Sequence, residues 1–249
     1  MSNQSAITLK DQGDYRIMSG ANDTVVMGLM NLQRPNDLVG EYPIAMMAGL
    51  LFGSVVDYPR MHAMQLGLGP GALTKYCWAR LGMQVTAVEL DPAVVRACRD
   101  QFGLPPNGER LRVVLADAAD EIARPQYRES VDLLHVDVYD GQSLRPALDD
   151  ISFWADCRNA LTEQGCMTVN LWGADPAYCV YDSVARISSV FGRESIWLLH
   201  LTTAPNIVLV ARRSPMPADP LDLMQQACVV HLLNGVPAHR FLVQLACPL

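Results

Sequence analysis

Residues 64–78, "MQLGLGPGALTKYCW", join an apolar run to a glycine-rich turn and then to a helix-like pattern. Gly67, Gly69 and Ala72 match the spacing G-x-G-x-x-G/A, which follows a strand and opens a helix in nucleotide-binding α/β sheets. Glycines let the backbone turn tightly and approach a ligand closely. Pro70 stands among these glycines, so the stretch predicts a nucleotide-like ligand and leaves open what the proline does to its chemistry.

The chain on either side of this turn alternates between β-like and helix-like segments. Two strand-like runs near the end, 195–201 and 206–213, are close enough in sequence to pair as an antiparallel hairpin. The whole order predicts an α/β fold with a doubly wound, mostly parallel seven-stranded sheet. The other strands are expected at 62–68, 84–90, 111–117, 131–139 and 166–172, and the helices at 72–82, 93–103, 118–124, 149–165 and 175–192.

Both ends of the chain lie outside this alternation. Two β-like runs within 14–33 indicate a small N-terminal β-element, and the next apolar segment, 34–53, reads as a helix. Pro43 inside that segment implies either that the helix starts near Tyr42 or that it kinks there. The predicted division is an N-terminal β-element at 1–35, a Rossmann domain at 36–213 and a packed C-terminal extension at 214–249.

Composition narrows the classes of function. Half of the 249 residues are hydrophobic and the net charge is −7, without a basic tract, so a nucleic-acid partner is not expected. The apolar run 44–56 is too short to span a membrane. Seven dispersed cysteines, none spaced as CxxC, suggest reduced thiols in a cytoplasmic protein and no zinc site.

Acidic residues follow three successive predicted strands. Glu89 stands about 20 residues beyond the glycine turn, where a carboxylate can accept hydrogen bonds from a ribose diol; the alternative is a solvated glutamate. Asp117 could accept a hydrogen bond from an adenine amino group or cap the following helix, and both could hold. Asp137 and Asp140 could bind an amine and take its proton, or be an ordinary strand-end and turn pair.

These segments together resemble the spermidine synthase (polyamine aminopropyltransferase) family, within the S-adenosylmethionine-dependent methyltransferase-like superfamily. The likeness covers about residues 23–212 and implies a class I methyltransferase-like Rossmann fold. It also implies a transferase that moves an aminopropyl group from decarboxylated S-adenosylmethionine to an amine such as putrescine. The motifs that carry it are "LGLGPGALTKYCW", "VTAVELDPAVVRACRDQFG", "LRVVLADAADEI", "VDLLHVDVYDG" and "GLMNLQRPNDLVGEYPIAMM".

The resemblance assigns roles to individual residues. Asp137 would be the base, Asp140 would help hold the substrate amine, and Tyr42 would border the substrate channel. The nucleoside half would be formed by Glu89 at the ribose, by Asp117 and Ala118 at the adenine, by Gly67 and Gly69 at the thioether, and by Asn31, where the family usually has a glutamine. The resemblance also implies a small-molecule amine substrate and no metal, and it is compatible with a homodimer.

The sequence departs from the family where a cationic substrate would need acceptors. Pro70 replaces an aspartate that usually faces the aminopropyl amine, and Pro43 and Ile44 replace a polar residue and a glutamate. A neutral residue does not offset the desolvation of an ammonium group. Two other functions therefore stay open, a methyltransferase that uses ordinary S-adenosylmethionine and a non-catalytic nucleoside-binding protein.

Overall fold

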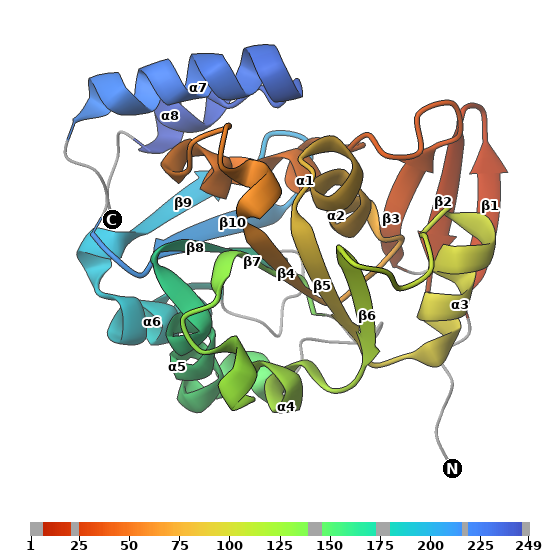
Figure 1. Ribbon diagram of the computed structural model, residues 1–249, viewed down its shortest axis with the longest axis horizontal. Coiled ribbons are helices and arrows are strands. Elements are labelled where there is room, and N and C mark those ends of the chain that lie inside the picture. Colours follow the sequence, from red (N-terminus) through yellow and green to blue (C-terminus); the bar gives the residue numbers. More distant parts are fainter. Residues whose placement is uncertain (1–6, 21–24, 139–145, 173–179, 216–218, 246–249) are drawn as a thin grey trace.

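A computed structural model describes residues 7–20, 25–138, 146–172, 180–215 and 219–245. Within these residues the main sheet contains seven strands in the order β6-β5-β4-β7-β8-β10-β9 (Figure 1). Strand β10 is antiparallel to both β8 and β9, and the other pairings are parallel. The predicted sheet and its closing hairpin are thus confirmed. The strands are β4 (His62–Leu66), β5 (Gln84–Glu89), β6 (Leu111–Leu115), β7 (Val131–Val136), β8 (Leu161–Trp172), β9 (Ile196–His200) and β10 (Asn206–Arg212).

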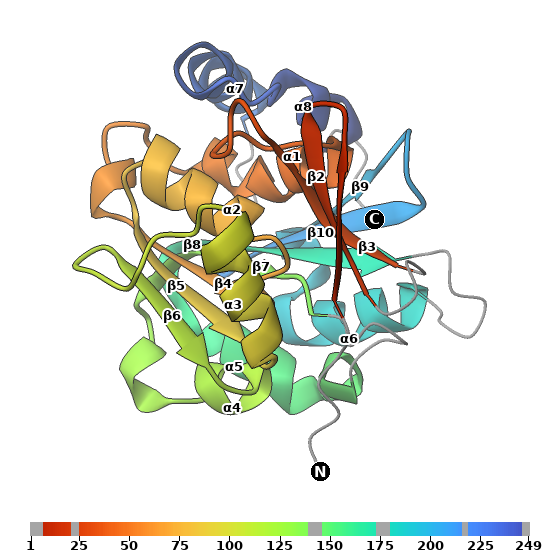
Figure 2. The same cartoon turned by 90° about the vertical axis from the view of Figure 1, so that its right-hand side faces the viewer.

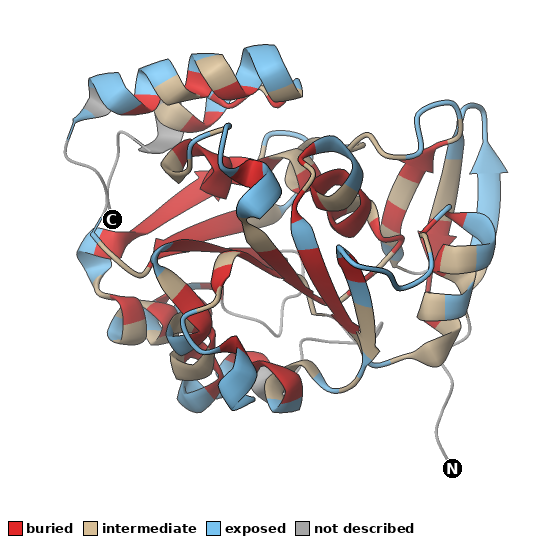
Figure 3. Ribbon diagram, viewed as in Figure 1, coloured by how far each residue is buried: buried red, intermediate tan, exposed pale blue. Residues whose placement is uncertain are grey.

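Helices cover both faces of this sheet, as a doubly wound fold requires. One core lies beneath α1 (Glu41–Ala45), the 3₁₀ helix Met46–Phe52, α2 (Ala72–Lys75), α3 (Pro92–Gln101), α7 (Pro220–Asn234) and α8 (His239–Leu245). The other lies beneath α4 (Ala118–Ile122), α5 (Ile151–Ala160) and α6 (Val180–Phe191). Figure 3 shows the central strands buried between these two layers. A π-helix, Tyr76–Arg80, directly continues α2. Short 3₁₀ helices lie at Tyr58–Arg60, Pro125–Tyr127, Pro146–Asp149 and Arg193–Ser195.

A small antiparallel sheet, β1 (Thr8–Gln12), β2 (Tyr15–Ser19) and β3 (Val26–Asn31), precedes the main domain. The sequence indicated only its second and third strands. Strand β1 is polar and almost wholly exposed, so it carries no apolar alternation to reveal it. Figure 2 shows this sheet beside α3, and Arg16 on β2 donates to the carbonyl oxygen of Gln101 at 2.8 Å.

Two predicted helices have other bounds in the structure. The helix expected at 34–53 begins only at Glu41 and continues as the 3₁₀ helix Met46–Phe52. Pro43 therefore falls in the first turn of α1, where its missing N–H costs no helical hydrogen bond. The helix expected at 149–165 ends at Ala160, because Leu161 already pairs with Val131 as the first residue of β8.

Candidate active site

The glycine turn lies where the winding of the sheet reverses. Strand β4 pairs with β5 on one side and with β7 on the other, so connections from β4 and β7 diverge at their carboxyl ends. Ligands of open α/β sheets bind at such a point. Gly67 has a φ of +86°, and a Cβ there would overlap the carbonyl oxygen of Asp137. The turn after β4 and the end of β7 can therefore approach so closely only because this residue is glycine.

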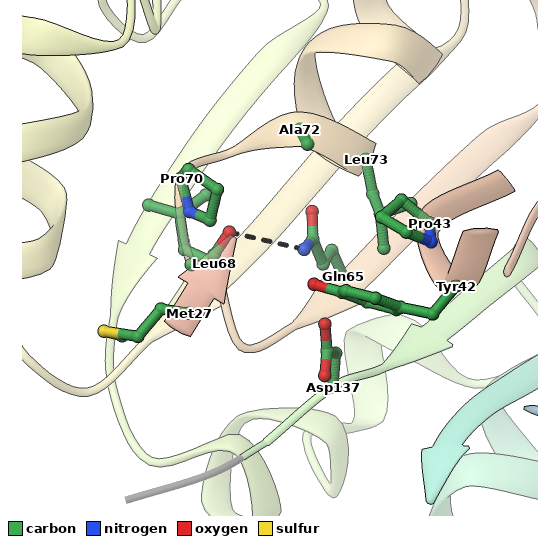
Figure 4. Close-up of a pocket in the computed structure, with 10 residues that line it drawn as sticks. Met27, Tyr42, Pro43, Gln65, Leu68, Pro70, Ala72, Leu73 and Asp137 are labelled. Carbon is green, nitrogen blue, oxygen red and sulfur yellow. Dashed lines mark hydrogen bonds between the residues drawn. The ribbon is translucent and has the colours of Figure 1, made fainter. Parts of the chain in front are cut away.

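A small cavity opens beside this turn (Figure 4). Its polar side chains are those of Tyr42 on α1, Gln65 on β4 and Asp137 after β7. The structure thus brings three of the site residues predicted from the sequence, Tyr42, Gly69 and Asp137, to one cavity. The remaining lining residues are Met27, Pro43, Leu68, Pro70, Ala72 and Leu73.

Asp137 is held by hydrogen bonds from two elements. The side-chain Nδ2 of Asn170 on β8 donates to Asp137 Oδ1 at 2.8 Å, and the Tyr42 hydroxyl forms a second hydrogen bond with the carboxylate. Burial raises the pKa of Asp137 to about 6, although both hydrogen bonds oppose that rise. Asp137 is therefore ionised at neutral pH. Its pKa lies close enough to neutral pH for the carboxylate to take up and release a proton.

Asn170 and Gln65 were not predicted from the sequence as site residues. Each is a buried amide with apolar residues directly before and after it in its strand, and that is the sequence signal that could have revealed them. Gln65 Oε1 accepts a hydrogen bond from the Thr74 hydroxyl, and its Nε2 lies 3.5 Å from the carbonyl oxygen of Leu68 (Figure 4). The Gln65 side chain is thus oriented by α2 and by the glycine turn.

Glu89 lies at the end of β5, directly against the glycine turn. Its Oε2 accepts a hydrogen bond from the backbone N–H of Leu68 at 3.0 Å, and its Oε1 accepts from the N–H of Asp91 at 2.8 Å. Burial raises the pKa of Glu89. A carboxylate can accept about four hydrogen bonds, so the residue can still accept one from a diol beside those from the backbone N–H groups of Leu68, Leu90 and Asp91. Its contact with a ribose stays a prediction.

Asp117 caps helix α4. Its Oδ1 accepts a hydrogen bond from the N–H of Ala119 at 2.8 Å, and Ala118 is the first residue of the helix. The capping interpretation is thus confirmed. Asp117 follows β6, the neighbour of β5, so it lies on the same carboxyl edge of the sheet as Glu89. A contact of Asp117 or Ala118 with adenine stays a prediction.

Five of the predicted site residues with described positions are not among those that line the cavity, namely Asn31, Gly67, Glu89, Asp117 and Ala118. Asn31, at the end of β3, accepts hydrogen bonds through Oδ1 from the N–H groups of Gln33 and Arg34, both at 2.9 Å, so its side chain closes a local turn. Its contact with a nucleoside stays a prediction. Asp140 lies outside the described residues. Among the residues with described positions, no three His, Cys, Asp or Glu side chains gather as a metal ion would need.

Pro70 is buried at the cavity wall and packs against strand β3. A Cβ on Gly28 of β3 would lie 2.6 Å from Pro70 Cγ, so the proline ring fills the space above this glycine. At position 70 the cavity is therefore lined by an apolar ring rather than by a charged acceptor. Pro43 also lines the cavity, and Ile44 packs against the core.

Comparison with known proteins agrees with this geometry. A family model described as a methyltransferase domain matches residues 64–145. The chain is similar to the polyamine aminopropyltransferase of Neisseria meningitidis serogroup A, with 33% identity over 242 residues, which is 96% of this chain and 88% of that protein. It is also similar to the polyamine aminopropyltransferase of Chromobacterium violaceum, with 32% identity over 210 residues, which is 84% of this chain and 77% of that protein.

Solved structures confirm the methyltransferase-like fold. A probable spermidine synthase from Corynebacterium glutamicum superposes with a TM-score of 0.71 at 19% identity, covering 96% of this chain and 91% of that one. Human methyltransferase-like protein 13 in complex with SAH superposes with a TM-score of 0.69 at 22% identity, covering 79% of this chain and 93% of that one. With an identity above 30% along almost its whole length to named aminopropyltransferases, the chain belongs to the polyamine aminopropyltransferase family.

Proposed function

We propose that this protein transfers an aminopropyl group from decarboxylated S-adenosylmethionine to a small-molecule amine such as putrescine, with Asp137 as the base. The observation that carries the proposal is the position of Asp137. Its carboxylate lines a cavity at the switch point of the sheet, beside a glycine turn and within hydrogen-bond reach of Tyr42 and Asn170. Membership of the aminopropyltransferase family supports the same reaction.

The chemistry explains why a carboxylate is needed. An alkylammonium group has a reference pKa of about 10, so the acceptor arrives protonated and without a lone pair. Asp137 would bind this cation and take one proton from it. The freed nitrogen lone pair then attacks the carbon beside the sulfonium, the carbon–sulfur bond breaks, and methylthioadenosine leaves. The positive charge lost from sulfur appears on the new secondary amine, so charge and atoms balance.

The nucleoside half of the donor would bind along the carboxyl edge of the sheet. Glu89 would accept a hydrogen bond from the ribose diol, and Asp117 with Ala118 would contact adenine. Gly67 and Gly69 would let the thioether approach the turn, and Tyr42 would border the amine channel. Asn31 would contact the nucleoside, and Asp140 would hold the acceptor amine.

Methyl transfer from ordinary S-adenosylmethionine is the second candidate, and one observation favours it. Asp137 is the one carboxylate among the described residues that line the cavity, while Pro70 and Gln65 are neutral. A donor that carries its own carboxylate therefore meets less repulsion than it would meet with an aspartate at position 70.

A homodimer, a cytoplasmic location and the three-region division of the chain stay predictions. Along the described parts of the chain, no helix has the length and apolar character needed to cross a bilayer.

Calorimetric titration distinguishes the two candidates. The purified protein would be titrated with methylthioadenosine, S-adenosylmethionine and decarboxylated S-adenosylmethionine, each with and without putrescine. Aminopropyl transfer predicts tighter binding of the decarboxylated donor and of methylthioadenosine. Preference for ordinary S-adenosylmethionine and for S-adenosylhomocysteine would instead assign the site to methyl transfer.

A further inference from the structure

The two hydrogen-bond donors to Asp137 come from elements far apart in the chain, yet one turn holds both. Tyr42 belongs to α1 and Asn170 to β8. The connection 201–205 joins β9 to β10, and together with Asn206, the first residue of β10, it is called the β9–β10 turn below. It contacts Glu41, the immediate neighbour of Tyr42, and the side chain of Asn170. None of the residues of this turn is among the described residues that line the cavity, and its contacts with Glu41 and Asn170 lead to the two donors.

Glu41 forms the first connection. Its carboxylate accepts hydrogen bonds from the backbone N–H and the hydroxyl of both Thr202 and Thr203, at distances between 2.6 and 3.0 Å. These hydrogen bonds lower the pKa of Glu41 to about 2, against the effect of its burial, so the carboxylate stays ionised at any working pH. Because Glu41 directly precedes Tyr42, this contact fixes the backbone from which the tyrosine reaches Asp137.

Asn206 forms the second connection. Its Nδ2 donates to Asn170 Oδ1 at 2.8 Å, while Asn170 Nδ2 donates to Asp137 Oδ1, also at 2.8 Å. An amide has one acceptor oxygen and one donor nitrogen, so a donor on the oxygen determines which end faces Asp137. With Asn206 in place, the Asn170 amide presents its nitrogen to the carboxylate. Loss of Asn206 would remove this constraint on the orientation of the amide.

We propose that the β9–β10 turn is the positioning element of the site, with Glu41, Thr202, Thr203 and Asn206 holding Tyr42 and Asn170 against Asp137. This inference rests on the proposed role of Asp137 as the base. Among the described residues, the polar side chains that contact Asp137 or line the cavity with it are Tyr42 from α1, Asn170 from β8 and Gln65 from β4, and the tyrosine is the titratable one among these three. Loosening either donor removes a hydrogen bond to the ionised carboxylate and so favours its protonated form.

The test measures the pKa of Asp137 directly, by carbon-13 NMR of the carboxyl group, together with kcat and KM. Glu41→Ala and Asn206→Leu should each raise this pKa above its value of about 6. Each should lower kcat on the order of 10-fold, with the KM for the donor unchanged. Thr203→Val, which removes only one hydroxyl donor, should act in the same direction and more weakly. Asp11→Ala, which removes an exposed ion pair with Arg16, is the matched control and should change neither quantity.

Double variants show whether the turn acts through the two donors. In a Tyr42→Phe background, adding Glu41→Ala should raise the pKa of Asp137 no further. In an Asn170→Ala background, adding Asn206→Leu should likewise leave the pKa of Asp137 unchanged. An unchanged pKa in both single variants, or full additivity in both double variants, would overturn the inference. If Asp137 is not the base, the result is different. The Asp137→Asn variant would then retain turnover, whatever pKa the NMR titration gives for Asp137 in the other variants.

Discussion

Asn170 on β8 donates its side-chain amide to Asp137 across two neighbouring parallel strands, at an Nδ2–Oδ1 distance of 2.8 Å. The hydrogen bond favours the ionised form of Asp137, while burial of the carboxyl group favours the neutral form. Burial dominates, and the pKa of Asp137 is about 6 rather than its ordinary 3.8. The residue is thus an ionised carboxylate at neutral pH that accepts a proton more readily than an exposed aspartate.

The pH dependence of catalysis should report this group. A base must be deprotonated in the free enzyme, so kcat/KM should rise with pH and level off above a pKa of about 6. Asn170→Ala removes a hydrogen bond that holds the pKa down, and it should move the acidic limb to higher pH. Initial rates between pH 5 and 9 would check both statements. If Asn170→Ala left the acidic limb at the same pH, this limb would not report the ionisation of Asp137.

Pro70→Asp should restore discrimination between the two sulfonium donors. A carboxylate at this wall of the cavity would attract the aminopropyl ammonium of the decarboxylated donor and repel the carboxylate of the ordinary one. We expect the ratio of kcat/KM for the two donors to shift toward the decarboxylated one by about 10-fold or more. Competition assays with both donors would measure the ratio. Pro70→Ala is the control without a new charge, and an equal ratio in both variants would refute an electrostatic role.

Gly28→Ala should destabilise the packing of the small N-terminal sheet on the glycine turn. The new methyl group would lie 2.6 Å from Pro70 Cγ and 2.8 Å from its Cδ, and a proline ring cannot rotate away. Overpacking of this kind costs about 1–3 kcal/mol of unfolding free energy. Denaturant unfolding would measure it. Gly28 also has a positive φ, of +153°, so part of the cost comes from the backbone. Gly103→Ala is the control for a positive φ without a steric clash, because φ there is +67° and the new Cβ would meet no atom within 4 Å.

Lys75 should make the stability of the fold depend on pH in the alkaline range. Its buried Nζ donates to the carbonyl oxygens of Pro35 at 2.8 Å and Phe102 at 2.6 Å and to the sulfur of Met30 at 3.2 Å. Burial lowers the pKa of Lys75 from 10.5 to about 8. Between these two values the unfolded chain binds more protons than the folded one, so this group makes the unfolding free energy rise with pH.

The Lys75→Met variant isolates that contribution. The slope of unfolding free energy against pH, between about 8 and 10, should be lower in the variant than in the parent by up to about 1.4 kcal/mol per pH unit. Urea unfolding at several pH values in this range would give both slopes. Thiols and phenols that do not interact with Lys75 titrate alike in both proteins and cancel in the difference, and burial raises the pKa of the interacting Cys98 thiol. Parallel slopes would mean that Lys75 titrates alike in the folded and unfolded states.

The sequence predicted those parts of the fold that local patterns determine. Alternating strands and helices gave the doubly wound sheet, and the position of Asp137 after a strand placed it on the ligand edge. Contacts between distant residues could not be predicted in this way. Thr202 lies 161 residues from Glu41, and the change from helix to strand at Leu161 depends on pairing with Val131. The partner of the Asn170 amide likewise depends on the order of strands in the sheet, which a single strand pattern does not specify.

The central claim is tested most directly by the products of the purified protein. Incubation with putrescine and either decarboxylated or ordinary S-adenosylmethionine would be followed by mass spectrometry of both the nucleoside and the amine. The account predicts methylthioadenosine and an amine heavier by one aminopropyl group, from the decarboxylated donor, with a loss of 10²-fold or more in Asp137→Asn. Formation of S-adenosylhomocysteine from the ordinary donor, without methylthioadenosine from the decarboxylated one, would contradict it.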